Sequence, residues 1–216
     1  MLIAHASDLH GDITPMLDLH RMKGQPDVWV LTGDMFPNKT RGVVAEEIPF
    51  QEEWAAANKE RLTDLLEGQK VVLVPGNHDY ADLAEILRSC GAHVFEVTPE
   101  GVEVLGLRWA GFREIPYIMG EWAGETHDFT DLVDRVVATD PDIVVTHAPA
   151  AGILDIGCQG FNKGINQLTS ALSYRMRNVK AHFFGHVHTS GGEHCYDMGI
   201  LFANGAETCR MFEMDV

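Results

Sequence analysis

Cysteine is scarce in this chain, and the few cysteines lie far apart. The four of them, at positions 90, 158, 195 and 209, never form a Cys-x-x-Cys pair. The sequence therefore favours neither a structural zinc site built from thiolates nor a disulfide framework. We interpret them as reduced, mostly buried thiols.

Long apolar runs are absent as well. No segment of the sequence approaches the roughly 18 consecutive apolar residues that a membrane-spanning helix needs, so we expect no membrane partner. The chain begins directly with a strand-like segment, without the basic and apolar regions of a signal peptide. These features lead us to expect a cytoplasmic protein.

Basic residues are few compared with acidic ones. Lys and Arg total 16 against 32 Asp and Glu, which gives a formal net charge of −16. A protein that grips extended DNA or RNA presents a basic surface, so the sequence argues against that partner. Bound divalent cations would offset part of the acidity locally, and a small anionic substrate is therefore compatible with it.

The composition is that of a soluble globular protein, with 45% hydrophobic and 22% charged residues. We expect one domain over residues 1–216. Strand-like and helix-like segments alternate, which predicts an α/β fold. The expected strands cover residues 3–7, 28–32, 71–74, 143–146 and 181–184. The expected helices cover residues 14–23, 51–67, 82–89, 131–138 and 166–177.

The segments between these elements are less regular. Residues 94–97 and 102–109 predict two strands of a hairpin-like region that opens a second sheet. Residues 194–197 and 200–203 predict two closing strands. Residues 35–50 and 112–130 are expected to be long loops, and in the second loop Arg113 is a candidate phosphate contact.

Five of the expected strands end in polar residues that suit metal binding. The segments at these ends are Asp8-Leu9-His10, Gly33-Asp34, Gly76-Asn77-His78-Asp79, His147-Ala148-Pro149 and Gly185-His186-Val187-His188. Ligands of open α/β sheets bind at the carboxyl ends of the strands. One such segment alone is common surface sequence, but five in one chain predict a metal site.

The residue types indicate which metals the site would take. Asp and His together suit divalent ions such as Mn, Fe, Zn, Co or Ni, and we expect manganese. In Asp8-x-His10 and in His186-x-His188, the two side chains would share one face of an extended segment, because strand side chains repeat every second residue. Each pair could hold one metal, so the pattern predicts two ions.

Taken in order, the five segments resemble the calcineurin-like metallophosphoesterase family. The match runs from residue 8 to residue 188 with every segment in the family's order. The resemblance implies a four-layer α/β/β/α sandwich with two mixed β-sheets and a dinuclear metal centre. The stretch from His147 through Gly152-Ile153-Leu154-Asp155 is also similar to a subgroup that acts on phosphodiesters.

The resemblance implies a role for each matched residue. The first metal would be held by Asp8, His10 and His188, the second by Asn77, His147 and His186, and Asp34 would bridge the two. His78 would lie beside the reacting phosphate without binding metal, and Asp79 would orient its ring. Many family members carry a second Asp three residues after the Gly-Asp, whereas Pro37 stands at that position here.

These roles agree with the chemistry of phosphoester hydrolysis. Two divalent cations roughly 3.5–4 Å apart can share a water, lower its pKa and give a hydroxide for in-line attack on phosphorus. The cations also neutralise the phosphate oxygens. His78 could then give a proton to the leaving alkoxide. We therefore expect a phosphodiesterase with a small substrate, for which a nucleotide is one candidate.

Three other interpretations stay open. The chain could be a phosphomonoesterase, such as a protein or nucleotide phosphatase, and relative turnover of bis-p-nitrophenyl and p-nitrophenyl phosphate distinguishes the two. It could be a non-catalytic metal-binding scaffold, although a scaffold would not require the His78-Asp79 pair. It could also be a nuclease that acts on short oligonucleotides.

Overall fold

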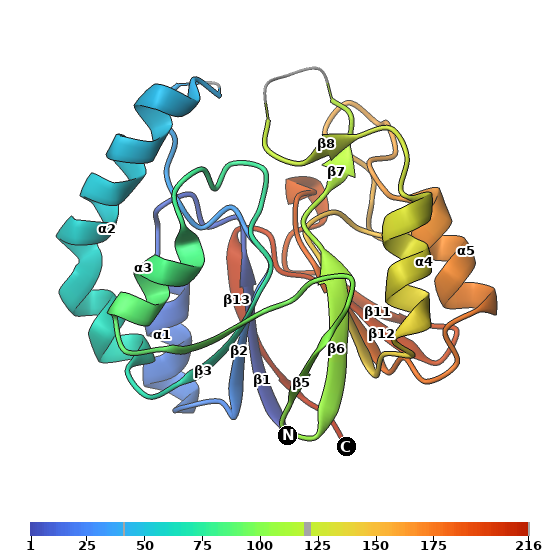
Figure 1. Cartoon of the computed structure of the whole chain (residues 1–216). Helices are drawn as coiled ribbons and strands as arrows, with labels where there is room; N and C mark the ends of the chain where they lie inside the picture. The colour runs from blue at the N-terminus through green and yellow to red at the C-terminus, as the bar shows by residue number, and fades with distance from the viewer. Residues whose placement is uncertain (41, 119–121, 216) are drawn as a thin grey trace.

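Two mixed β-sheets lie face to face, and helices cover the outer side of each (Figure 1). The computed structural model describes residues 1–40, 42–118 and 122–215. Helices α1, α2 and α3 cover one sheet, and α4 and α5 cover the other, which confirms the expected order of layers. The helices are α1 (Thr14–Lys23), α2 (Val44–Leu66), α3 (Leu83–Ser89), α4 (Thr130–Ala138) and α5 (Asn166–Tyr174).

The first sheet has the strand order β13-β1-β2-β3-β4. Its strands are β1 (Leu2–Ser7), β2 (Val28–Leu31), β3 (Lys70–Leu73), β4 (His93–Glu96) and β13 (Thr208–Glu213). Strands β1 to β4 are parallel, and β13 pairs with β1 in the antiparallel direction. The carboxyl ends of β1, β2 and β3 therefore emerge at the same edge.

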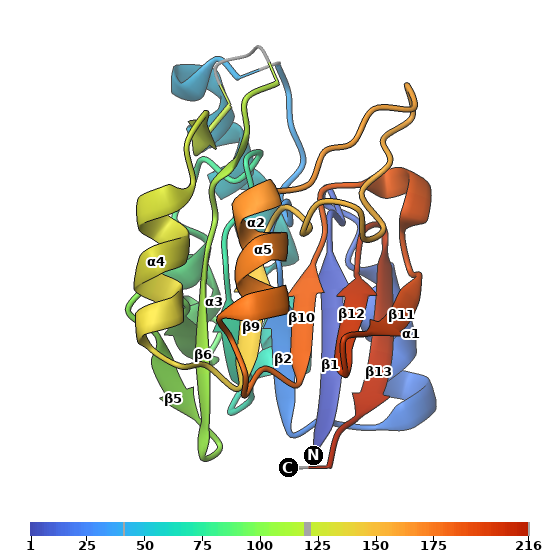
Figure 2. The same ribbon diagram turned by 90° about the vertical axis from the view of Figure 1, so that its right-hand side faces the viewer.

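The second sheet has the strand order β11-β12-β10-β9-β6-β5. Its strands are β5 (Val102–Val104), β6 (Leu107–Phe112), β9 (Ile143–Thr146), β10 (Ala181–Phe184), β11 (His194–Asp197) and β12 (Ile200–Asn204). Strands β6, β9, β10 and β12 are parallel. In Figure 2, β10 and β1 both run from the edge near the chain termini toward the opposite edge, so the two sheets deliver their carboxyl ends to the same place.

Neighbouring residues of the apolar strands pack into different cores. In β2, Val28 and Val30 face the core between the two sheets. Trp29 and Leu31 face the core between the first sheet and its helices. Strand β9 alternates in the same way between the inter-sheet core and the core beneath α4 and α5. Both faces of these strands are buried, which explains why the sequence shows continuous apolar runs there.

Helix α1 shows how the connecting helices are anchored. Pro15 stands in its first turn, where the missing N–H removes no helical hydrogen bond. Met16 and Leu19 are buried against the first sheet. Gly24, with φ of 80°, follows the last residue and lets the chain turn back toward β2. The expected bounds of this helix are confirmed.

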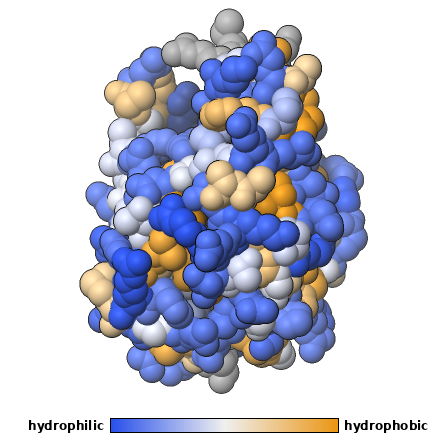
Figure 3. Space-filling model, turned by 90° about the vertical axis from the view of Figure 1, so that its left-hand side faces the viewer, coloured by the Kyte–Doolittle hydropathy of each residue, from blue (hydrophilic) through white to orange (hydrophobic). Residues whose placement is uncertain are grey.

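The outer surface over α1, α2 and α3 is largely hydrophilic, with apolar side chains interspersed among polar ones (Figure 3). Within the part of the chain that the structure describes, no helix combines the length and apolar character needed to cross a bilayer.

Several features of the secondary structure differ from expectation. Residues 44–50 belong to α2 instead of a loop, and the helix continues through Pro49, because the buried side chains of Glu47 and Gln51 anchor this end to the neighbouring loops. Strand β4 lies in the first sheet beside β3, and the hairpin is formed by β5 and β6 instead. The sequence does not predict strand β13, because its apolar side chains are mixed with polar ones and are only half-buried.

The loop expected over residues 112–130 is also more structured than its sequence indicates. It contains the short parallel strands β7 (Ile115–Pro116) and β8 (Glu125–Thr126). Residues 119–121 lie outside the described residues.

Phe183 tests the location of the inter-sheet core, because its side chain is fully buried between the sheets. Replacing it with Ala should lower the free energy of unfolding by about 3–5 kcal/mol, since a large cavity replaces the ring. Urea unfolding followed by circular dichroism measures the change. Phe161→Ala is the matched control, because that ring is 65% exposed, and it should change stability by less than about 0.5 kcal/mol. Equal losses in the two variants would contradict this core.

Candidate metal centre

The polar segments after five strands converge at the edge where both sheets end. Three overlapping groups of side chains have ligand atoms within 4.8 Å of one another. The groups are Asp8, His10 and His188; His10, Asp34 and His78; and Asp8, Asp34 and His147. Asp8, His10 and Asp34 each belong to two groups, so the three groups form one continuous site.

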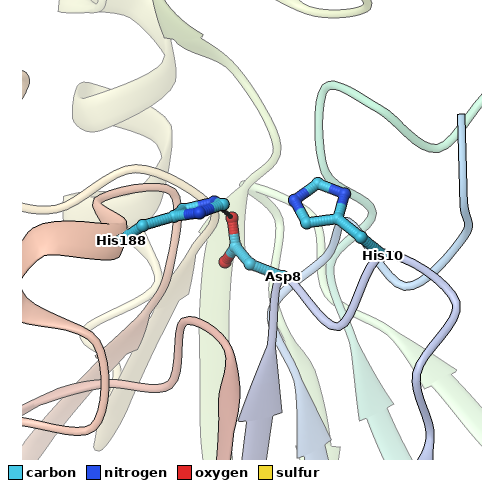
Figure 4. A group of neighbouring side chains, drawn as sticks. All are labelled: Asp8, His10 and His188. Carbon is cyan, nitrogen blue, oxygen red and sulfur yellow. Dashed lines mark hydrogen bonds and ion pairs between the residues drawn. The ribbon is translucent and has the colours of Figure 1, made fainter.

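The first group combines residues from opposite ends of the chain (Figure 4). Asp8 and His10 follow β1, and His188 begins the short 3-10 helix η1 (His188–Ser190). Asp8 Oδ1 lies 3.2 Å from His188 Nε2, and the ring of His10 lies 5.3 Å from the ring of His188. In Figure 4 the two rings lie on either side of the Asp8 carboxylate. These are the three residues expected for one metal.

The side chains expected for the other metal lie deeper. His147 Nε2 is 3.0 Å from Asn77 Oδ1 and 3.4 Å from Asp34 Oδ2. The ring of His186 lies 5.1 Å from that of His147. Asp34, Asn77 and His147 are each at most 1% exposed. The side chains expected for the other metal are therefore neighbours, with Asp34 beside both groups.

The carboxylates of Asp8 and Asp34 are each held in place through one oxygen, and each turns its second oxygen toward the site. Asp8 Oδ2 accepts the backbone N–H of His186 at 2.8 Å and the hydroxyl of Ser7 at 2.6 Å. Asp34 Oδ1 accepts the backbone N–H of His78 at 2.7 Å. The other oxygens, Asp8 Oδ1 and Asp34 Oδ2, face histidine rings. These hydrogen bonds orient the carboxylates of Asp8 and Asp34.

Left-handed backbone conformations, rather than strand alternation, aim these side chains. The φ angles of Asp8, His10, Asp34 and His186 are 50°, 44°, 53° and 65°. Non-glycine residues rarely adopt such angles, and they cluster at functional sites. The expectation that Asp8-x-His10 and His186-x-His188 lie in extended segments is therefore wrong, because the strands end before these residues. The pairs still converge, through turns.

Close approach of the backbone requires glycine at two positions beside the carboxylates. A Cβ atom on Gly76 would lie 2.0 Å from Asp34 Oδ1. A Cβ atom on Gly185 would lie 2.2 Å from Asp8 Oδ2. Both distances are far below a van der Waals contact, so the Gly-Asn-His and Gly-His-x-His segments need their glycines for packing.

The charges of the site shift the pKa values of its histidines in opposite directions. Burial alone would lower the pKa of His147, but the Asp34 carboxylate, with Asp8 behind it, raises it to about 9. Burial lowers the pKa of His186 to about 3, and nearby His147 contributes to the same shift. The hydrogen bond with Asp8 raises the pKa of His188. Burial lowers the pKa of His78 against the pull of Asp34.

The contacts of His147 identify its protonation state without a metal. Nδ1–H donates to the carbonyl of Thr32 at 2.6 Å, and Nε2–H donates to Asn77 Oδ1. Both ring nitrogens face oxygen atoms, which favours the doubly protonated ring and agrees with the raised pKa of His147. A metal ion at the same point would take the place of the Nε2 proton.

His78 and Asp79 do not form the pair that the resemblance implies. Asp79 accepts backbone N–H groups of Gly76, Asp34, Met35 and Phe36, and these bonds tie the β2 and β3 turns together. The ring of His78 is held instead by Asn38, whose Oδ1 lies 2.7 Å from Nδ1. The expectation that Asp79 orients the ring is therefore wrong. Asn38 stands one residue after Pro37 and supplies a contact to His78 that the sequence pattern did not predict.

Two further side chains near His78 differ from expectation. Arg113 Nη2 donates to the carbonyls of Gly76 and Asp79, at 2.7 Å and 3.2 Å, so its guanidinium braces this turn instead of being a free phosphate contact. The indole of Trp122 packs on the ring of His78 with centroids 4.2 Å apart. No motif pointed to Trp122, because only folding of its loop brings it to the site.

The residues present fit a pair of divalent cations. Carboxylate oxygens, imidazole nitrogens and one amide converge, which is a donor set typical of Mn, Fe or Zn sites. The buried Asn77 Nδ2 has no hydrogen-bond partner within the described part of the chain. An unsatisfied buried donor is rare in folded proteins, and this one fits a water or an anionic oxygen at the site, because an amide N–H does not bind a cation.

Comparisons with known proteins agree with this geometry. The model of the calcineurin-like phosphoesterase family matches residues 1–190. No curated protein matches the chain.

Several solved structures share the fold at low sequence identity. TT1561 of Thermus thermophilus has a TM-score of 0.61 at 13% identity, over 98% of this chain and 97% of that one. A 5′-nucleotidase from Candida albicans has a TM-score of 0.50 at 12% identity, over 94% of this chain and 45% of that one. GAP50, the anchor in the inner membrane complex of Plasmodium, has a TM-score of 0.50 at 14% identity, over 95% of this chain and 71% of that one.

Gly76 tests the packing around Asp34. Gly76→Ala should weaken Mn²⁺ binding by at least about tenfold, because the new Cβ atom displaces a carboxylate that faces the site. Gly106→Ala is the control: its φ of 75° means that the substitution strains the β5–β6 turn, but the new Cβ meets open space away from the site, and that variant should bind Mn²⁺ like the parent. Isothermal titration calorimetry measures both. Unchanged binding by Gly76→Ala would contradict the role of the close approach.

His147 makes metal binding dependent on pH. The ring must lose its Nε2 proton before that nitrogen can bind a cation, and its pKa is raised to about 9. Mn²⁺ affinity should therefore rise by up to about tenfold per pH unit from about pH 7 to about pH 9 and then level off. Calorimetry in buffers of different ionisation enthalpy should also detect the released proton. An affinity independent of pH would contradict the protonated state of His147.

Proposed function

Because this chain belongs to the calcineurin-like phosphoesterase family, we propose that it hydrolyses small phosphodiesters at a centre of two divalent metal ions, with manganese as the preferred metal. The family consists of metal-dependent phosphoester hydrolases. The observation that carries the proposal is the convergence of Asp8, His10, Asp34, His147 and His188 around one site, at whose edge His78 is held through its own hydrogen bond.

The assignment of ligands follows the two sets of side chains that are expected for the two ions. Asp8, His10 and His188 would hold one ion, and Asn77, His147 and His186 the other. Asp34 would contact both, because its Oδ2 is turned toward the site between them. Two such ions, when bound, supply positive charge to the phosphate oxygens and lower the pKa of an attacking water.

His78 would deliver the proton that the leaving group needs. Its Nδ1–H donates to Asn38, so Nε2 is the nitrogen that faces the site, 3.9 Å from Asp34 Oδ2. A proton on Nε2 passes to the ester oxygen as the bond between phosphorus and that oxygen breaks, and the ring is left neutral. The indole of Trp122 covers the ring on one side and restricts its movement.

A cavity on another side of the centre supports a diester substrate. Its volume is about 420 Å³, and its lining residues are Ile118, Gly157, Cys158, Lys163, His186, Val187, His188 and Thr189. His78 is not among these residues, so the cavity is separate from the place where the leaving group would depart. A diester carries two organic groups and would use both places, whereas a monoester would use only one.

A phosphomonoesterase is the second candidate. The similarity in fold to the 5′-nucleotidase from Candida albicans favours it, because a 5′-nucleotide is a phosphomonoester. A non-catalytic scaffold is a candidate of another class, and the similarity in fold to GAP50 favours it, since that protein is an anchor. Metal content and turnover separate these possibilities.

The decisive measurement combines metal stoichiometry with hydrolysis of two esters in Mn²⁺. We expect about two ions per chain and faster turnover of bis-p-nitrophenyl phosphate than of p-nitrophenyl phosphate, because the second ester group occupies the cavity. Faster turnover of the monoester would support a phosphatase. Two bound ions with no turnover of either ester would support a scaffold.

The His78→Ala variant is the matching test of the proton donor. Turnover of a diester with a poorly leaving alcohol should fall about 10²- to 10⁴-fold, since the alkoxide leaves without a proton. Metal content should stay the same, because His78 is not needed to hold either ion. A variant with full turnover would remove His78 from the mechanism.

A further inference from the structure

Helix α2 begins at the edge of the first sheet where the metal centre lies (Figure 1). Two of its polar side chains, Glu47 and Gln51, are fully buried. They are four residues apart and therefore lie on the same face of the helix. Buried polar side chains are costly unless they are fully hydrogen-bonded, so the contacts of this pair indicate what the helix holds.

Gln51 holds the turn that carries His78. Its Nε2 donates to the carbonyl of His78 at 2.7 Å. Its Oε1 accepts the backbone N–H groups of Tyr80 and Ala81, both at 2.9 Å. One side chain thus satisfies three backbone groups on either side of Asp79, and it ties this turn to α2.

Glu47 holds the loop that faces this turn. Its carboxylate accepts the backbone N–H groups of Lys39 and Thr40, at 3.0 Å and 2.7 Å, and the hydroxyl of Thr40 at 2.7 Å. Asn38 Nδ2 donates to the same carboxylate at 3.4 Å. Burial alone would raise the pKa of Glu47, but these donors bring it below its ordinary value. The carboxylate is therefore charged, and the loop is wrapped around it.

Asn38 connects these two anchored segments. Its Nδ2 faces two acceptors, the Glu47 carboxylate and the carbonyl of His78, the latter at 3.3 Å. The amide oxygen must therefore point the other way, toward His78 Nδ1 at 2.7 Å. Glu47 in this way determines that the Asn38 amide turns its oxygen toward the His78 ring. The proton on His78 Nδ1 therefore stays in place, and Nε2 is the nitrogen that can release one.

We propose that Asn38, oriented by Glu47 and by the His78 carbonyl that Gln51 also holds, is the positioning residue that fixes the tautomer and direction of the His78 ring for proton donation. The neutral amide accepts Nδ1–H before and after the transfer, so only the Nε2 proton moves, to the leaving oxygen. The ring regains that proton from solvent before the next turnover. This assignment rests on the proposed function, in which His78 is the proton donor.

The leaving group of the substrate provides a sharp test. Asn38→Ala should lower kcat about 10- to 100-fold for a diester with an alkyl leaving group, which requires a proton. It should change kcat by less than about threefold for bis-p-nitrophenyl phosphate, whose nitrophenolate leaves without one, and KM should stay the same for both. Glu47→Gln should give the same selective loss at smaller size.

Two variants make the comparison specific. Asn58→Ala, which removes an asparagine inside α2 whose amide contacts Trp54 and Arg61, should leave both substrates unaffected. In a His78→Ala background, Asn38→Ala should cause no further loss, because it acts through His78. Equal losses for both leaving groups, or full additivity with His78→Ala, would overturn the positioning role.

A spectroscopic readout separates this proposal from the proposed function. In ¹⁵N-labelled protein, the neutral ring of His78 should show the Nδ1–H tautomer in the parent and a mixture of tautomers in Asn38→Ala. An unchanged tautomer in the variant overturns the positioning role. If the parent hydrolyses no ester yet the tautomer shifts as expected, the proposed function fails while Asn38 still orients the ring.

Discussion

The close placement of two buried carboxylates governs this end of the molecule. Asp8 and Asp34 are each about 1% exposed and share a ligand group with His147. Their charges repel in a region of low dielectric, and hydrogen-bond donors and one histidine ring offset part of that repulsion. Backbone N–H groups of His186 and His78 donate to them, and His147 takes up a second proton. Cations would satisfy the remaining oxygens.

The same constraint explains why the backbone, more than side-chain flexibility, shapes the site. Positive φ angles at Asp8 and Asp34 turn these side chains toward the place where the two sheets end. Gly76 and Gly185 let the facing segments approach them closely. The turn after β1 is thus packed against Gly185, which follows β10, and the turn after β2 is packed against Gly76, which follows β3. The backbone therefore sets the direction of both carboxylates.

The sequence was informative where local pattern and tertiary structure agree. The apolar runs of β2 and β9 predicted their bounds well, because both faces of these strands are buried. The ordered ligand segments predicted which residues converge. Asn38 has no signal in the sequence, because it follows the expected position by one residue and an amide there has no distinctive pattern. Strand β13 has none either, because it is half-exposed and its strand character depends on pairing with β1.

The antiparallel pairing of β1 with β13 has a consequence for biosynthesis. These two strands are paired along their whole length, from Leu2 with Glu213 to Ser7 with Thr208. A nascent chain therefore exposes one free edge of β1 until β13 has been synthesised, and an open edge invites pairing with other chains. His186 and His188 also emerge late, long after Asp8 and Asp34. The edge of β1 and the ligand set of the site are therefore both completed by late segments of the chain.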